Sequence, residues 1–90
     1  MLTPAERQAL KAKAHKLEPV VQIGTKGLTE QVIIEIDRAL AAHALIKVRA
    51  GSFEREAREE IFQTVAEKAG AEAVQQVGKV CVLYRKIPDD

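Results

Sequence analysis

The stretch VVQIGTKGLTEQVIIEI, residues 20–36, decides the fold because the period of its apolar side chains changes at two glycines. The short apolar run at residues 20–23 is typical of a strand and ends at Gly24. After Gly27 and Leu28 the spacing becomes helical, with Val32, Ile33, Ile36, Leu40 and His43 expected on one side of a helix that begins near Thr29. A strand therefore leads through a four-residue loop into a helix.

Before this stretch, the chain predicts an N-terminal helix that begins at Pro4 and ends before Pro19. Thr3 can cap this helix, and Glu6 stands where a capping box needs its acid. Basic residues also recur along it at a spacing of four, which predicts one shared, exposed face for Arg7, Lys11 and His15.

After this stretch, LIKVRA at residues 45–50 alternates between apolar and basic side chains. Such alternation predicts a strand with one face in the core and with Lys47 and Arg49 on the other face. Gly51 and Ser52 are expected to form a turn and to cap a third helix.

The third helix is predicted from an apolar stripe and from Gly70, which can end it. The stripe consists of Ala57, Ile61, Val65 and Ala69. Two strands then follow at residues 73–77 and 80–85, joined by Gly78 and Lys79 in a hairpin of type II′.

The expected fold is α+β, as a two-layer arrangement: an N-terminal helix, then β-α-β-α-β-β with a four-stranded mixed sheet. The two strand–helix–strand units predict parallel neighbours, and the closing hairpin adds an antiparallel strand. VCVLY at residues 80–84 is nearly all apolar, so it fits an interior strand. With 90 residues, the chain is expected to form one domain over residues 1–90.

Composition and charge set broad limits on function. The chain is 47% hydrophobic and has no apolar run long enough to cross a bilayer, so a folded protein without a membrane span is expected. The net charge is only +1, but residues 1–27 hold five basic and two acidic residues. Such a basic end suits a nucleic-acid partner, although a solvated helix face produces it as well. The single cysteine, Cys81, and the lack of a signal-peptide pattern predict a reducing compartment, the cytoplasm.

The inventory of reactive residues favours a protein that is not an enzyme. Ser52, the only serine, is explained as a cap, and Cys81 lies in the most apolar strand, where a thiol behaves as a small buried hydrophobe. His15 and His43 lie far apart, so neither a catalytic triad nor a metal site is expected. We expect no cofactor, no metal and no small-molecule substrate.

The loop GTKG is the motif that the fold does not fully explain. Glycine lets another backbone approach closely, and a loop that leads into a helix N-terminus can present N–H groups to an anion. Lys26 adds a positive charge at the tip. The spacing is not that of a nucleotide-binding P-loop, whereas KH domains use a GxxG loop on a single-stranded nucleic-acid backbone. A plain strand-to-helix turn is the alternative explanation.

Four collinear blocks resemble the bacterial YhbY family, whose members are single CRM domains (chloroplast RNA splicing and ribosome maturation). The blocks are LTPAERQALKAKAHKLEPVVQIGTKGLT, EIDRALAAHALIKVR, EREAREEI and VQQVGKVCVLYR, and the resemblance runs from Leu2 to Ile87. It implies a fold similar to the C-terminal domain of bacterial translation initiation factor three, with a KH-like GxxG loop. It also implies binding to RNA, in precursors of the large ribosomal subunit. Family members often carry Lys directly after the first glycine, whereas here Thr25 precedes Lys26.

The leading hypothesis is therefore a non-catalytic, monomeric RNA-binding module that aids assembly of the large ribosomal subunit. The residues expected to contact RNA are Gly24, Thr25, Lys26, Gly27, Lys47, Arg49, Arg7 and Lys11. A second hypothesis is an adaptor that docks on a ribosomal or assembly protein through the acidic third helix, at Glu56, Glu59 and Glu60. Tyr84 is the one aromatic residue expected to offer a stacking surface, because Phe62 is expected in the core.

Overall fold

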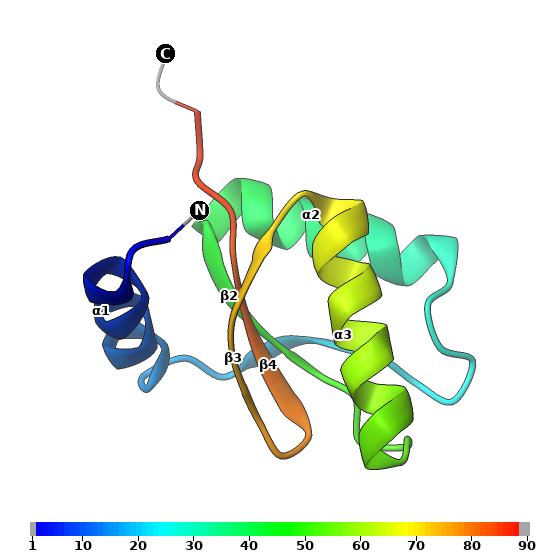
Figure 1. The fold of residues 1–90 in the computed structure, drawn as a ribbon. Helices are drawn as coiled ribbons and strands as arrows, with labels where there is room; N and C mark the ends of the chain where they lie inside the picture. The colour runs from blue at the N-terminus through cyan, green and yellow to red at the C-terminus, as the bar shows by residue number, and fades with distance from the viewer. Residues whose placement is uncertain (1, 89–90) are drawn as a thin grey trace.

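The computed structural model describes residues 2–88, in which three helices and four strands follow one another in the predicted order (Figure 1). The elements are α1 (Pro4–Ala14), β1 (Pro19–Gln22), α2 (Glu30–His43), β2 (Leu45–Arg49), α3 (Arg55–Ala69), β3 (Glu72–Val77) and β4 (Val80–Tyr84). The α+β class and the four-stranded mixed sheet are thus confirmed. None of the described helices is both long and apolar enough to cross a membrane.

The sheet has the strand order β1-β2-β4-β3. Strands β1 and β2 are parallel neighbours, as expected for the first strand–helix–strand unit. The second unit does not follow that expectation, because β4 lies between β2 and β3 and is antiparallel to both. The hairpin turns β4 back into the sheet, where its apolar side chains are covered on both faces. The prediction of an interior strand at residues 80–84 is therefore confirmed, while adjacency of β2 and β3 was wrong.

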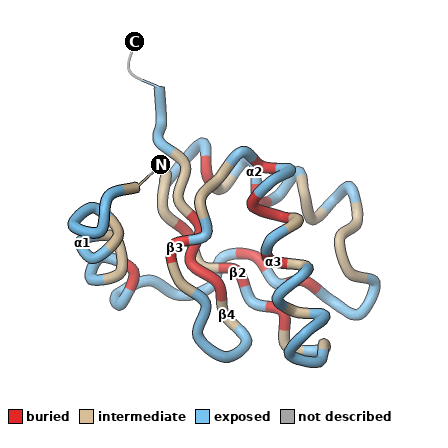
Figure 2. Tube along the Cα trace, in the orientation of Figure 1, coloured by how far each residue is buried: buried red, intermediate tan, exposed pale blue. Residues whose placement is uncertain are grey.

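The main core lies between one face of the sheet and helices α2 and α3 (Figure 2). The alternation in β2 is confirmed, because Ile46, Val48 and Ala50 are buried in this core. Helix α2 contributes Ile36 and Leu40. Helix α3 contributes Phe62, Val65, Ala66 and Ala69, which confirms Phe62 as a core residue.

Helix α1 covers part of the opposite face of the sheet, apart from the other two helices (Figure 1). A small second cluster holds it there, built on Ala14, Val74 and Val82. Leu10, Leu45 and Tyr84 pack against this cluster while remaining partly exposed. The rest of this sheet face is open, so basic and apolar side chains of β1, β2 and β4 reach solvent beside α1.

The helix ends agree with the sequence at some positions and differ at others. Thr3 and Glu6 form the predicted capping box, and Gly70 ends α3 in the left-handed conformation with a φ of 64°. Ser52 was wrong as the cap of α3, since the helix begins later and Glu54 occupies the cap position without a side-chain hydrogen bond. Helix α2 ends at His43, and the capping residue Ala44 that follows has a φ of 65°, which is unusual for a residue with a Cβ atom.

Candidate nucleic-acid interface

The loop of Gly24, Thr25, Lys26 and Gly27 forms a closed turn at the end of β1. The N–H of Gly27 donates to the carbonyl oxygen of Gly24 at 2.9 Å, which folds the loop back on itself. Thr25 and Lys26 are exposed at its tip. Among the described residues, the backbone N–H groups of these two tip residues have no hydrogen-bond partner. The loop thus presents two donors and one mobile ammonium group to solvent.

The structure gives different explanations for the presence of glycine at the two ends of the loop. Gly27 has a φ of 74°, in the left-handed region that disfavours side chains. The φ of Gly24 lies outside that region, and a Cβ atom built on Gly24 would meet no atom within 4 Å. The turn itself therefore accounts for Gly27 alone. Gly24 leaves the backbone of the loop uncovered, which permits close approach by a ligand.

The N-terminus of α2 follows the loop after two residues. Thr29 caps it, and the Thr29 hydroxyl oxygen accepts a hydrogen bond from the N–H of Val32 at 3.2 Å. The positive end of the helix dipole favours an anion near this point. Glu30 in the first turn is exposed and partly offsets that effect. Most of the positive field at the loop must then come from Lys26 and its cationic neighbours.

Two of those neighbours, Arg49 and Lys79, lie at the same end of the sheet as the loop. The N–H of Ile23 donates to the carbonyl oxygen of Arg49 at 2.7 Å, which joins the start of the loop to the end of β2. The N–H of Ala50 donates to the carbonyl oxygen of Lys79 at 2.8 Å, which brings in the β3–β4 hairpin. The end of β1, the end of β2 and the hairpin tip therefore meet (Figure 1).

The side chains of Arg49 and Lys79 both lie over Gly51. The Nε atom of Arg49 is 3.5 Å, and the Cδ atom of Lys79 is 3.7 Å, from the place that a Cβ atom on Gly51 would occupy. The sequence did not predict Lys79 as a binding residue, because its position next to Gly78 indicated only a two-residue hairpin loop. The signal that could have found it is the antiparallel pairing of β4 with β2, which places the hairpin tip beside Arg49.

Lys47 and Lys11 both line a cleft between α1 and the open face of the sheet. This basic cleft has a volume of about 290 Å³. It is lined by Lys11, Ala14, His15, Pro19, Lys47, Gln75, Val77, Val80 and Val82. Lys47 lies two residues before Arg49 on the same face of β2, so the cleft continues the row of cations that begins at the loop.

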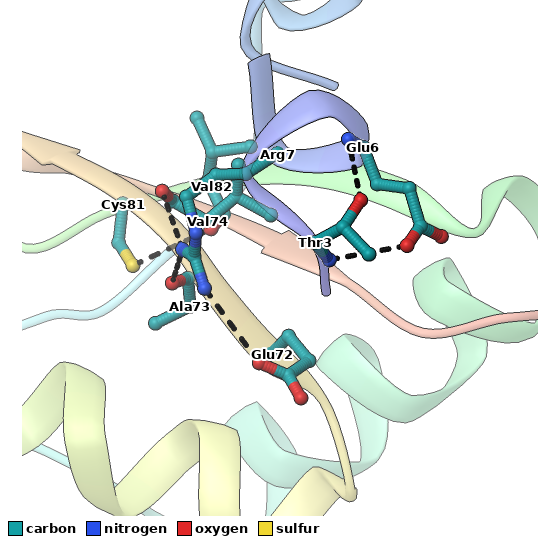
Figure 3. Close-up of polar contacts among 8 residues, drawn as sticks. All are labelled: Thr3, Glu6, Arg7, Glu72, Ala73, Val74, Cys81 and Val82. Carbon is teal, nitrogen blue, oxygen red and sulfur yellow. Dashed lines mark hydrogen bonds and ion pairs between the residues drawn. The ribbon is translucent and has the colours of Figure 1, made fainter. Parts of the chain in front are cut away.

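Arg7 does not lie on an exposed face, which corrects the expectation for the row of Arg7, Lys11 and His15. Its Nη1 atom donates to the carbonyl oxygens of Ala73 and Val74 at 2.9 and 3.0 Å (Figure 3). Its Nη2 atom lies 4.0 Å from a carboxylate oxygen of Glu72. The face of α1 that carries Arg7 and Lys11 turns toward β3, because the same face carries the packed residue Ala14. Of the three, His15 is exposed, whereas Arg7 and Lys11 are partly buried.

The groups that could carry chemistry elsewhere in the chain have structural explanations. Cys81 is buried, and burial raises the pKa of its thiol from 9.0 to about 12, as expected of a buried hydrophobe. His43 is exposed at the end of α2, away from the core side on which it was predicted. Residues 2–88 hold no group of three or more His, Cys, Asp or Glu side chains arranged to bind a metal ion.

The acidic side chains of α3 are exposed, as the adaptor hypothesis requires. Glu56, Glu59 and Glu60 all lie on the solvent side of the helix. Glu59 also forms an ion pair with Arg55 at 3.7 Å, one turn away. An exposed pair of this kind contributes little to stability and leaves the carboxylates accessible.

Comparison with known proteins gives a consistent result over nearly the whole chain. A family model described as the CRS1 / YhbY (CRM) domain matches residues 2–85. A protein of Haemophilus influenzae named "RNA-binding protein" is 43% identical over 84 residues, which cover 93% of this chain and 85% of the relative. A Pseudomonas aeruginosa protein named "Probable RNA-binding protein PA4753" is 37% identical over 87 residues, which cover 97% and 84% of the two chains.

A solved structure has the same fold. The solution structure of the Staphylococcus aureus hypothetical protein SAV1595, whose own description proposes RNA binding, superposes with a TM-score of 0.86. The two chains are 33% identical, and the match covers 100% of this chain and 94% of the other.

Proposed function

Because this chain belongs to the CRS1/YhbY (CRM) domain family, we propose that it is a non-catalytic RNA-binding protein. The names of its relatives support this proposal, since the Haemophilus and Pseudomonas proteins are both named for RNA binding. Support from the chain itself comes from the cations that meet at one end of the sheet and continue along β2. A polyanion that follows this row would gain most of its affinity from phosphate contacts.

The observation that carries the proposed site is the conformation of Gly24. Folding of the turn does not account for a glycine there, whereas close approach of an RNA backbone to the loop does. In this proposal the N–H groups of Thr25 and Lys26 donate to phosphate oxygens, and the Lys26 ammonium group adds a charge-assisted contact. Arg49, Lys47 and Lys11 extend the contact along the sheet face and into the basic cleft.

We propose ribosomal RNA in precursors of the large ribosomal subunit as the target. This choice rests on the resemblance to the YhbY family, which implies binding to such precursors. The protein would act there as a monomeric assembly factor in the cytoplasm. Cys81, with no second cysteine to pair with, supports a reducing compartment. Affinity directed at the backbone predicts a steep dependence on salt and little dependence on base sequence.

The experiment that tests the site compares RNA binding by the wild type and by Thr25→Asp combined with Lys26→Asp. Both glycines remain, so circular dichroism should show an unchanged fold. A matched control carries Lys86→Asp and Ile87→Asp, which change the net charge equally on the exposed segment after β4. Binding to large-subunit RNA fragments is measured across a salt series. We expect the loop variant to lose at least about tenfold in affinity and the control to lose much less.

The result that contradicts the loop assignment is equal loss of affinity in the loop variant and the control. If the wild type binds no RNA under any salt condition, the RNA proposal itself is wrong. The exposed acids of α3 then favour the adaptor function, which predicts binding to a basic ribosomal or assembly protein. That binding should weaken when Glu56 and Glu60 are replaced by Gln and survive the loop substitutions.

A further inference from the structure

A second cavity, larger than the basic cleft, lies at the opposite end of the sheet from the GTKG loop. This apolar groove has a volume of about 670 Å³ and runs between the end of α1, the start of β2 and the end of α2. Its apolar wall includes Leu10, Leu17, Val20, Leu45 and Tyr84. Val20 is 55% exposed and Leu17 is 36% exposed, so the wall faces solvent and is not a closed part of the core.

The rim of the groove is basic. Lys13, Lys16 and His43 line it, and all three are exposed. Glu18 is the single acidic residue among the lining residues of the described chain. An apolar wall with a cationic rim fits an occupant that has a flat apolar part and a negatively charged part. A nucleotide has both, and the volume is sufficient for one or two of them.

The groove also continues the row of cations that begins at the GTKG loop. Pro19 borders both the groove and the basic cleft, so the two cavities adjoin. Along β2, Arg49, Lys47 and Leu45 point to the same face, about 7 Å apart at each step. A strand of RNA that passes from the loop over Arg49 and Lys47 would therefore reach the groove at Leu45.

We propose that the apolar groove binds an unstacked nucleobase of the same RNA strand, with its ring against Tyr84. This inference rests on the proposed RNA binding and adds a second contact of different chemistry. Lys13 and Lys16 hold the phosphates on either side of the base. Tyr84 is half-buried, since it packs on the second cluster from one side and lines the groove with the other. An aromatic ring so held loses little freedom when a base stacks on it.

The chain offers a direct reporter of the groove, because Tyr84 is its only tyrosine and it has no tryptophan. The test follows the ring resonances of Tyr84 by NMR during titration with a short single-stranded oligoadenylate. An abasic oligonucleotide of the same length serves as the comparison, since it keeps the phosphates and lacks the bases. We expect the oligoadenylate to shift the Tyr84 resonances upfield and the abasic strand to leave them nearly unchanged.

A groove variant and the loop variant separate this inference from the proposed function. Val20→Glu with Lys16→Glu changes two exposed groove residues and should leave the fold intact by circular dichroism. It should abolish the shift of the Tyr84 resonances and lower the affinity for oligoadenylate at least about fivefold. This factor corresponds to the low end of the binding free energy that one base gains by stacking on an aromatic side chain. The loop variant, at saturating oligonucleotide, should still show the shift.

Three outcomes overturn the inference. If oligoadenylate binds and Tyr84 does not respond, the groove takes no base although RNA binding stands. If the abasic strand shifts Tyr84 equally, the rim is only a phosphate-binding surface. If an acidic amphipathic peptide shifts Tyr84 and oligoadenylate does not, the groove is a protein interface. Conversely, a Tyr84 shift together with unchanged affinity in the loop variant would support the groove and contradict the loop site.

Discussion

At the scale of single residues, Gly24 and Gly27 occupy one loop, but replacement by alanine should lower the stability of the fold only at Gly27. For Gly27→Ala we expect a loss of about 1–2 kcal/mol in the free energy of unfolding, because its φ of 74° is strained for any residue with a Cβ atom. For Gly24→Ala we expect a change within about 0.5 kcal/mol, because the site is open. Urea denaturation of both variants measures the difference.

For RNA binding we expect the opposite order, with a larger effect for Gly24→Ala than for Gly27→Ala. Gly24→Ala should weaken binding to large-subunit RNA fragments although the protein stays folded, because the methyl group stands between the loop backbone and the phosphate. Gly27→Ala, studied at a temperature where it is fully folded, should bind more nearly like the wild type. A Gly24→Ala protein with unchanged stability and unchanged RNA affinity would contradict the close-approach explanation of Gly24.

Some single residues could be predicted from the sequence and others could not. Thr3, Glu6 and Gly70 were predicted correctly because a cap depends on a few neighbouring residues. The positive φ of Ala44 could not be predicted, because helices that end in a positive φ usually do so at glycine or asparagine. Tertiary structure holds it there: the N–H of Arg85 donates to the Ala44 carbonyl oxygen at 2.8 Å.

At the scale of elements, Arg7 is the main polar link between α1 and the sheet. The register of β3 against β4 shifts between Ala73 and Gln75, and the Arg7 guanidinium donates to the carbonyl oxygens of Ala73 and Val74 at this irregularity. Such bulges leave backbone groups without ladder partners. Arg7 therefore donates to two carbonyl oxygens of β3 at the place where its pairing with β4 is irregular.

We expect Arg7→Ala to lower the free energy of unfolding by about 1–2 kcal/mol, since it leaves these two acceptors without their charged donor. Hydrogen exchange should rise first in α1 and β3. Arg7→Lys is the matched control, because it keeps the charge but lacks the planar guanidinium, whose Nη1 contacts the two carbonyl oxygens while Nη2 lies near Glu72. If the lysine variant is as stable as the wild type, a single ammonium group is sufficient to hold α1. The role of Arg7 in RNA binding stays a prediction, to be measured on the folded lysine variant.

The sequence predicted the type of every element and the interior position of β4, but it did not predict that β4 separates β2 from β3 or that α1 packs on the sheet through its basic face. The periodicity of apolar residues indicates which face of an element is apolar. For β2, the alternation of Ile46, Val48 and Ala50 was sufficient to predict the buried face. It does not report which neighbour covers that face. The row of Arg7 and Lys11 was predicted to lie on an exposed face of α1, but both residues share their side of the helix with Leu10 and Ala14 and are partly buried.

At the scale of the whole molecule, Cys81 links the stability of the fold to alkaline pH. Its pKa is about 12 in the folded protein against 9.0 for an ordinary thiol, so the folded state holds this proton more tightly. The resulting stabilisation is complete below pH 9 and is lost as the pH rises from 9 toward 12. We expect a loss of about 1 kcal/mol between pH 8 and pH 10, measured by urea denaturation.

Cys81→Ala is the control for this prediction, because it removes the thiol and leaves every other side chain of the protein unchanged. The alanine variant should be less stable near neutral pH, owing to the space left in the core, and should lose less stability between pH 8 and pH 10. Parallel pH profiles for the two proteins would show that Cys81 contributes nothing to the alkaline loss.

The position of β4 in the sheet also has a consequence for the order in which the protein can be made. Strands β2 and β3 are not neighbours, and β3 pairs with β4 alone. A nascent chain that has emerged only through residue 79 therefore offers β3 no strand to pair with and leaves β2 without its antiparallel neighbour. Translation proceeds from the N-terminus and is much slower than the closing of a hairpin. The four-stranded sheet therefore cannot form before β4, its last strand in the sequence, takes its interior position. The sheet should therefore complete its folding only after β4 has emerged.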